Sequence, residues 1–195
     1  MTSERGVVQC RLDEPVAARV VGSAELTLIQ CVTKGDKLDE VVRAATALGV
    51  GRIVVAESTR AIGRDGGGPR RSERWNAIAL DAARQSGRGD LPELEAPSPL
   101  TEVLARHAAL PAPKLCLHPQ AERGLGAALA ALRGAGLTLL VGPEGGFTSE
   151  ELALAATAGF ELVSFGPFVL RTELAGIAAL GAVLAARSEL EGRRP

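Results

Sequence analysis

Two glycine-containing stretches in the C-terminal third combine a flexible backbone with a few charged side chains. Residues 137–148 read LTLLVGPEGGFT, and residues 166–173 read GPFVLRTE. Glycines around a single glutamate let the backbone approach a ligand closely, and arginine is an always charged multiple donor. One such turn alone would be an ordinary strand-to-helix connection. Two turns built alike, about 25 residues apart, favour a small-molecule pocket instead.

The first stretch carries the local signals of a strand, a turn and a helix. Residues 137–141 are apolar and predict a buried strand, and Thr148 with Glu151 three residues later matches a helix capping box. No Lys-Ser/Thr pair follows the glycines, and their spacing is not G-x-G-x-x-G. The stretch is therefore neither a phosphate-binding P-loop nor a dinucleotide fingerprint.

Composition narrows the class of protein. Hydrophobic residues make up 46% of the 195 residues, but only 3% are aromatic, so Ala, Leu and Val must form most of the core. The net charge of −1 argues against a generic nucleic-acid coat and is compatible with a local arginine patch. Cys10, Cys31 and Cys116 show neither metal-ligand spacing nor a disulfide framework, so we expect no metal and a reducing cytoplasm. No apolar stretch is long enough to predict a membrane span.

The pattern from Leu26 onward predicts alternating strands and helices, the arrangement of a doubly wound parallel sheet. We expect strands at 26–32, 52–56, 114–119, 137–141 and 161–165, and helices at 36–49 (capped by Asp36), 72–85, 121–133 and 172–190. Residues 91–113 are expected to form a loop with one short helix at 100–107, with His107 exposed. Trp75 is expected to anchor the core or an interface rather than stack on a base. Residues 7–12 and 16–21 predict two short strands that cannot bury a core alone.

The strings GPEGGF and VLRTE together resemble the paired cofactor loops of the SPOUT methyltransferases. They are similar in particular to RsmE, the family of small-subunit (16S) ribosomal RNA uridine-N3 methyltransferases. TKGDKLD at 33–39, ALGV at 47–50 and AARQSGR at 82–88 extend the resemblance over residues 26–190. It implies a SPOUT α/β domain at 26–195, with a parallel sheet, helices on both faces and a C-terminal trefoil knot. It also implies that residues 1–25 are the remnant of a PUA-like RNA-binding β-barrel.

The resemblance implies S-adenosylmethionine (SAM) as the cofactor and assigns roles to individual residues. Arg171 would stabilise negative charge on the uracil, and Glu173 would accept the N3 proton, although any acid is favoured in the first turn of a helix. Glu144 would accept from the ribose or hold the loop in shape, and Thr172 would contact the cofactor or cap the last helix. The expected cofactor-binding residues are Leu117, His118, Gly142, Pro143, Glu144, Gly145, Gly166, Leu170, Thr172 and Ala175.

The partners implied are small-subunit ribosomal RNA, or the assembled subunit, and a second copy of the chain. Arg60, Arg64, Arg70 and Arg71 would contact RNA phosphates, or would simply belong to a solvated linker. The last helix is apolar nearly all round, which favours packing in a homodimer. Phe168 replaces a basic residue usual in the family, and Leu174 replaces a threonine. Two alternatives therefore stand: a non-catalytic RNA- or ribosome-binding relative, or a SPOUT enzyme acting elsewhere, such as on a ribose 2′-hydroxyl.

Overall fold

The computed structural model describes residues 2–4, 7–9, 20, 26–61, 69–132 and 136–191. Arg64, Cys10 and most of the strand expected at 16–21 lie outside these residues. The strands are β1 (Thr2–Glu4), β2 (Val7–Gln9), β3 (Leu26–Cys31), β4 (Arg52–Glu57), β5 (Glu93–Pro99), β6 (Lys114–Leu117), β7 (Leu137–Val141) and β8 (Glu161–Val163). The helices are α1 (Lys37–Ala47), α2 (Pro69–Ser86), α3 (Leu100–Ala108), α4 (Leu125–Ala131), α5 (Ser149–Thr157) and α6 (Thr172–Glu191).

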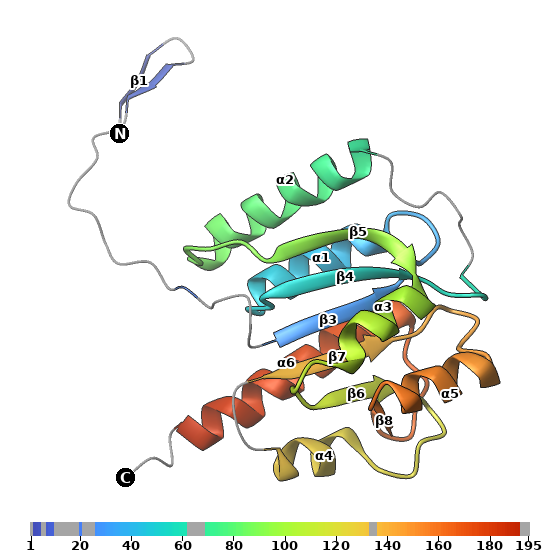
Figure 1. The fold of residues 1–195 in the computed structure, drawn as a ribbon. Helices are drawn as coiled ribbons and strands as arrows, with labels where there is room; N and C mark the ends of the chain where they lie inside the picture. The colour runs from blue at the N-terminus through green and yellow to red at the C-terminus, as the bar shows by residue number, and fades with distance from the viewer. Residues whose placement is uncertain are drawn as a thin grey trace.

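Strands β3 to β8 form one six-stranded sheet in the order β5-β4-β3-β7-β6-β8 (Figure 1). Every neighbouring pair in this sheet is parallel. The chain winds outward from β3 to β5 and then crosses over to β6, so the winding direction changes between β3 and β7. Open α/β sheets bind ligands outside the carboxyl ends of the strands at such a switch point. β1 and β2 pair separately as an antiparallel hairpin.

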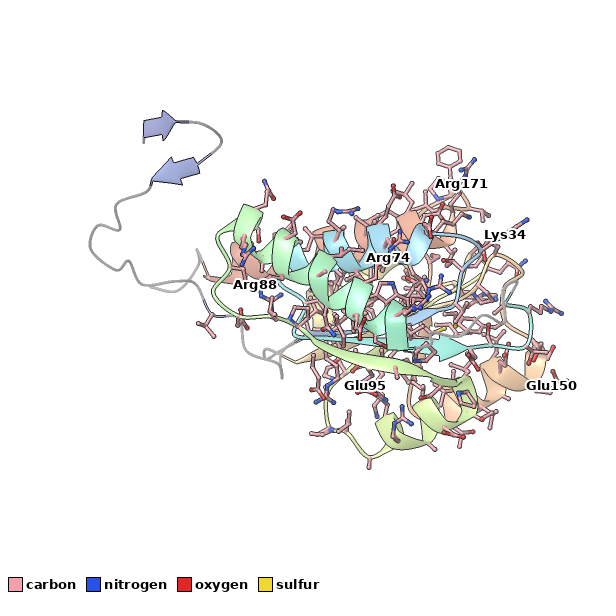
Figure 2. The ribbon with its side chains drawn as sticks, turned by 90° about the horizontal axis from the view of Figure 1, so that it is seen from above. Lys34, Arg74, Arg88, Glu95, Glu150 and Arg171 are labelled. Atoms are coloured by element: carbon pink, nitrogen blue, oxygen red, sulfur yellow. The ribbon has the colours of Figure 1, made fainter. Side chains whose placement is uncertain are left out.

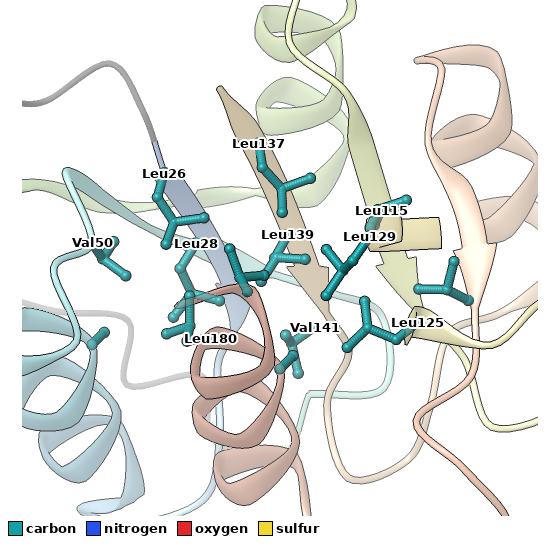
Figure 3. Packing of buried hydrophobic residues seen from close by; sticks show 14 of the residues in the cluster. Leu26, Leu28, Val50, Leu115, Leu125, Leu129, Leu137, Leu139, Val141 and Leu180 are labelled. Atoms are coloured by element: carbon teal, nitrogen blue, oxygen red, sulfur yellow. The ribbon is translucent and has the colours of Figure 1, made fainter. Parts of the chain in front are cut away.

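Both faces of the sheet are covered, because successive residues of the central strands are apolar on both sides. Leu28 belongs to a core cluster with residues of α1, α4 and α6, whereas the next residue, Ile29, packs with residues of α3 and α5. Figure 3 shows Leu180 of α6 and Leu125 of α4 against the first of these faces. Helix α2 packs on α1 through a third cluster that includes Trp75, which is 2% exposed. The predicted core role of Trp75 is confirmed.

One strand of the sheet, β5, was not predicted from the sequence. Residues 93–99 read ELEAPSP and were expected to be loop, yet they form β5 at the edge of the sheet. An edge strand pairs on one side only, so a proline without an N–H is tolerated there. The register also shifts between Val54 and Ala56, whose partners are Glu95 and Ser98, so that two residues of β5, Ala96 and Pro97, lie opposite one residue of β4.

Two local expectations near helices were wrong. His107 was expected at the surface but is 2% exposed, because it follows Val103 by four residues and so lies on the same buried face of α3. Its Nδ1 lies 2.9 Å from the Val103 carbonyl oxygen. Asp36 occupies the N-cap position of α1, but its side chain makes no capping hydrogen bond. The carboxylate of Asp36 lies 3.6 Å from Arg74 instead.

Candidate functional site

A cavity of about 640 Å³ opens at the carboxyl ends of β3, β6, β7 and β8, next to the switch point. This volume is within the range of sites for small ligands. Of the residues predicted to act on ligands, those lining the cavity are Arg60, Leu117, His118, Gly142, Pro143, Glu144, Gly145, Leu170, Arg171, Thr172 and Ala175. Segments more than 100 residues apart in the chain, such as those of Lys37 and Ala175, therefore meet at one place.

The first loop, residues 142–148, is held between β7 and the capped start of α5. Thr148 and Glu151 form the predicted capping box, with the Glu151 backbone N–H donating to Thr148 Oγ1 and the Thr148 N–H donating to Glu151 Oε2. An added Cβ on Gly142 would lie 2.8 Å from Cε2 of Phe147, so any other residue would require the ring or the loop to shift. Gly146 has φ +68°, which L side chains rarely adopt. The loop is thus a tightly packed wall of main chain.

Arg60 fastens the outer side of this loop. Its Nη1 donates to the carbonyl oxygens of Gly145 and Phe147, each at 3.3 Å. A Cβ on Gly145 would lie 3.0 Å from Cβ of Arg60, so the two backbones approach closely. Arg60 was predicted either to contact RNA phosphates or to belong to a solvated linker. Its guanidinium donates two hydrogen bonds to the loop.

Glu144 links the first loop to the start of α1. Its Oε1 accepts from the Lys34 backbone N–H at 3.2 Å and from Lys37 Nζ at 3.0 Å. Partial burial disfavours the charged carboxylate, but hydrogen bonds from its own backbone, Lys37 and Lys34 outweigh that effect and lower the pKa of Glu144. These contacts favour the loop-holding role over the ribose-binding role.

Lys37 joins the two loops and was missed by the sequence analysis. Its Nζ lies 3.0 Å from Glu144 of the first loop and 3.4 Å from Glu173 Oε2 at the start of α6. The hydrogen bond to Glu144 and the charge of both carboxylates raise the pKa of Lys37. Lys37 also lines the cavity, whereas Glu173 does not. The lysine is therefore the lining residue to which the expected proton acceptor is paired.

The second loop is joined to the first by Thr172. The Thr172 hydroxyl donates to the Gly142 carbonyl oxygen and accepts from Gln30 Nε2 at 3.1 Å. Thr172 is the first residue of α6 and is buried. The Thr172 hydroxyl therefore bonds to the first loop and to β3, and not to the backbone N–H groups of α6 as a helix cap would.

The rim of the cavity is open and partly apolar. Arg171 is exposed and projects from the same end of the molecule as Lys34, away from Arg88 (Figure 2). Phe168 and Val169 line the rim and are 79% and 80% exposed. The full set of lining residues that the sequence analysis did not name as ligands is Lys37, Pro119, Gln120, Val141, Gly146, Phe147, Phe165, Phe168 and Val169.

The remaining predicted residues lie apart from the cavity lining. Gly166, at φ +83°, shapes the second loop without lining the cavity. Arg70 is exposed on α2. Arg71 donates to the Gly35 carbonyl oxygen at 3.1 Å and stacks on Trp75, with its guanidinium carbon 5.5 Å from the ring centroid.

The described residues hold no group of three or more His, Cys, Asp or Glu side chains that could bind a metal ion. Cys31 and Cys116 are buried free thiols. Burial raises the pKa of the Cys116 thiol to about 12. None of the helices within the described part of the chain is long and apolar enough to cross a membrane.

Together these observations define an α/β protein with a small-molecule pocket built by two loops at the sheet's switch point. A family model described as an RNA methyltransferase domain matches residues 22–184. The chain therefore belongs to the RNA methyltransferase domain family.

Individual relatives agree with the resemblance to RsmE stated from the motifs. The ribosomal RNA small subunit methyltransferase E of Mycobacterium tuberculosis is 32% identical over 163 residues, covering 81% of this chain. The chain spans 62% of the length of that relative.

Solved structures show the same fold. Ribosomal RNA small subunit methyltransferase E from Neisseria gonorrhoeae, bound to S-adenosyl methionine, has a TM-score of 0.73 at 33% identity, over 83% of this chain and 66% of that one. A putative methyltransferase from Legionella pneumophila, in complex with the same cofactor, has a TM-score of 0.74 at 32% identity, over 84% of this chain and 67% of that one.

Proposed function

We propose that this chain is a SAM-dependent methyltransferase that modifies N3 of a uridine in small-subunit ribosomal RNA. The proposal depends on one observation: both glycine-containing loops line a single cavity, with Arg171 at its rim. The family match supports it, as do two relatives of known structure that hold SAM.

The residues of the cavity fit this cofactor. Gly142 and Gly145 line the cavity without side chains, so an adenine could approach the main chain of the loop closely. Leu117, Leu170 and Ala175 supply apolar wall. We assign cofactor binding to the predicted set that lines the cavity, with Glu144 and Gly166 shaping the loops rather than touching the ligand.

The chemistry requires two things of the protein. The bound cofactor supplies an electrophilic methyl group, and uracil must lose its N3 proton as that methyl is attacked. Negative charge then spreads onto O2 and O4 of the base, where the always protonated guanidinium of Arg171 would stabilise it. We assign proton acceptance to Glu173. Its Oε2 is buried without a hydrogen bond and lies 3.4 Å from Nζ of Lys37, which lines the cavity.

RNA recognition would use the basic residues outside the cavity. Arg70 is exposed and suits a phosphate contact, and Arg64 and Arg71 belong to the same proposed surface. Arg60 would act on RNA only through the loop that it holds. We assign residues 26–195 to the SPOUT domain.

We further propose a homodimer in the cytoplasm, with a trefoil knot at the C-terminus of each chain. The apolar residues exposed beside α6 support the dimer: Phe168, Val169 and Leu174, the last 49% exposed. Packing them against a second copy would remove them from water.

The test is methylation of small ribosomal subunits that lack the modification, followed by mass spectrometry of the nucleosides. The proposal expects 3-methyluridine from the native chain. Arg171→Ala should lower turnover at least a hundredfold, in the range of a lost charge-stabilising donor, while SAM affinity changes little. Arg43→Ala is the matched control, because it removes an exposed arginine of α1 that neither lines the cavity nor belongs to the proposed RNA-binding surface. Methyl groups on ribose would overturn the N3 assignment, and undiminished turnover in Arg171→Ala would remove Arg171 from the mechanism.

A further inference from the structure

Gln30 lies beneath the pocket and has no role in the account above. It is a polar side chain on the central strand β3, where its neighbours are apolar, and it is 0% exposed. It does not line the cavity. Burying an amide in a core is costly unless its hydrogen bonds are made, so its position needs an explanation.

The amide of Gln30 fixes the direction of a hydrogen bond that joins the loops. Nε2 donates to Thr172 Oγ1 at 3.1 Å, and its second contact is the Cys31 carbonyl oxygen at 3.4 Å. A threonine hydroxyl has one proton to give. Because Thr172 accepts from Gln30, that proton is directed to the Gly142 carbonyl oxygen.

The other end of the amide fits the same orientation. Oε1 of Gln30 is buried and has no hydrogen-bond partner in the structure, and it faces Gly176 of α6, where an added Cβ would lie 2.9 Å away. With the amide reversed, Oε1 would accept the Thr172 proton and leave the Gly142 carbonyl without its donor. In the observed orientation Gln30 Oε1 has no hydrogen bond, but the hydrogen bond that joins the two loops is kept.

We propose that Gln30 is a positioning residue for the cofactor pocket, acting through Thr172 on the Gly142 peptide. Its amide joins β3, the start of α6 and the first loop, so that both loops hold one arrangement before a ligand arrives. The inference rests on the proposed function for its link to SAM. The geometry of the joint itself does not depend on the ligand.

The experiment compares Gln30→Leu with the native full chain in two measurements. The first is hydrogen exchange without ligand, in which residues 142–147 should exchange at least several-fold faster while α1 is unchanged. The second is a calorimetric titration with SAM, in which affinity should fall about tenfold, the value of one hydrogen bond. Thermal stability should be unchanged or higher, because leucine of similar size removes a buried unpaired acceptor. If Gln30 only stabilised the fold, Gln30→Leu would lower the thermal stability and leave hydrogen exchange at residues 142–147 as in the native chain.

Two further variants sharpen the comparison. Thr46→Val removes another buried hydroxyl, which bonds to the Val42 carbonyl oxygen at 2.7 Å within α1, and it should leave SAM affinity unchanged. In a Thr172→Val background, Gln30→Leu should have no further effect on loop exchange, since both act through one hydroxyl.

Native exchange at residues 142–147 in Gln30→Leu, or additive effects of the two substitutions, would overturn the inference. If the native chain fails to bind SAM, the proposed function fails, and the exchange measurement still decides whether Gln30 holds the loops.

Discussion

Gly142→Ala tests how closely the first loop must pack. The new Cβ would lie 2.8, 3.1 and 3.2 Å from Cε2, Cζ and Cδ2 of the Phe147 ring. Real Cβ contacts of 2.8 Å are essentially never seen, so the ring or the loop must move. Phe147 is 8% exposed and packs in a cluster with residues of α3 and α5, so a shift of the ring would disturb those contacts.

The expected cost follows from overpacking a core, about 1–3 kcal/mol of the free energy of unfolding. Backbone strain adds nothing, because φ of Gly142 is not positive. The Gly142 carbonyl also accepts from Thr172, so a displaced loop should weaken SAM binding as well. Denaturant unfolding and calorimetric titration would measure the two effects separately.

Gly126→Ala is the matched control. Gly126 is in α4, and a Cβ there would meet nothing within 4 Å. Alanine in a helix is favoured over glycine by roughly 0.5–1 kcal/mol, so this variant should be slightly more stable and bind SAM normally. Adding Phe147→Leu to Gly142→Ala should recover part of the lost stability, because leucine is smaller than the phenyl ring that the new Cβ would meet. A Gly142→Ala protein as stable as the native chain, with native SAM affinity, would refute the close-packing argument.

Two further predictions concern a pH dependence and a buried hydrogen bond. The lowered pKa of Glu144 means that its bonds to Lys37 and Lys34 stabilise the folded chain above the ordinary glutamate pKa of about 4.3, and that this contribution is lost as the pH falls further through the lowered pKa. Glu144→Gln should therefore flatten the acid side of a stability-against-pH curve, and an unchanged acid limb would contradict this. Trp75→Phe removes the bond from Nε1 to buried Asp39 at 3.1 Å and should cost about 2 kcal/mol in denaturant unfolding. Leu80→Ala, at a position 40% exposed on the same helix, is its control. Equal losses of stability in the two variants would show that the hydrogen bond to Asp39 contributes nothing beyond side-chain packing.

The sequence was sufficient for most of the α/β alternation, because buried parallel strands and amphipathic helices leave distinct apolar patterns. The capping box at Thr148 was predicted correctly since it depends on residues three apart. Strand β5 was missed because an edge strand tolerates proline and its register shift interrupts the alternation. His107 was misplaced because a short helix with few apolar residues gives little sign of which face is buried.

The pocket was predictable where the motif itself lines it and unpredictable where distant residues support it. Both loops could be recognised from their short sequence motifs, and most of their residues line one cavity. Lys37 reaches Glu144 across 107 positions, and Gln30 reaches Thr172 across 142. No local pattern marks a lysine at a helix start or a glutamine in a buried strand as a support for a loop so far away. Those contacts depend on which strand ends meet at the switch point.

The most direct test of the account is a calorimetric titration of the folded native chain with SAM, repeated with Gly142→Ala. The account predicts saturable binding of one cofactor per chain, and weaker binding in the variant. Absence of binding at high micromolar SAM, with the chain folded, would contradict the cofactor pocket and favour a non-catalytic RNA-binding relative.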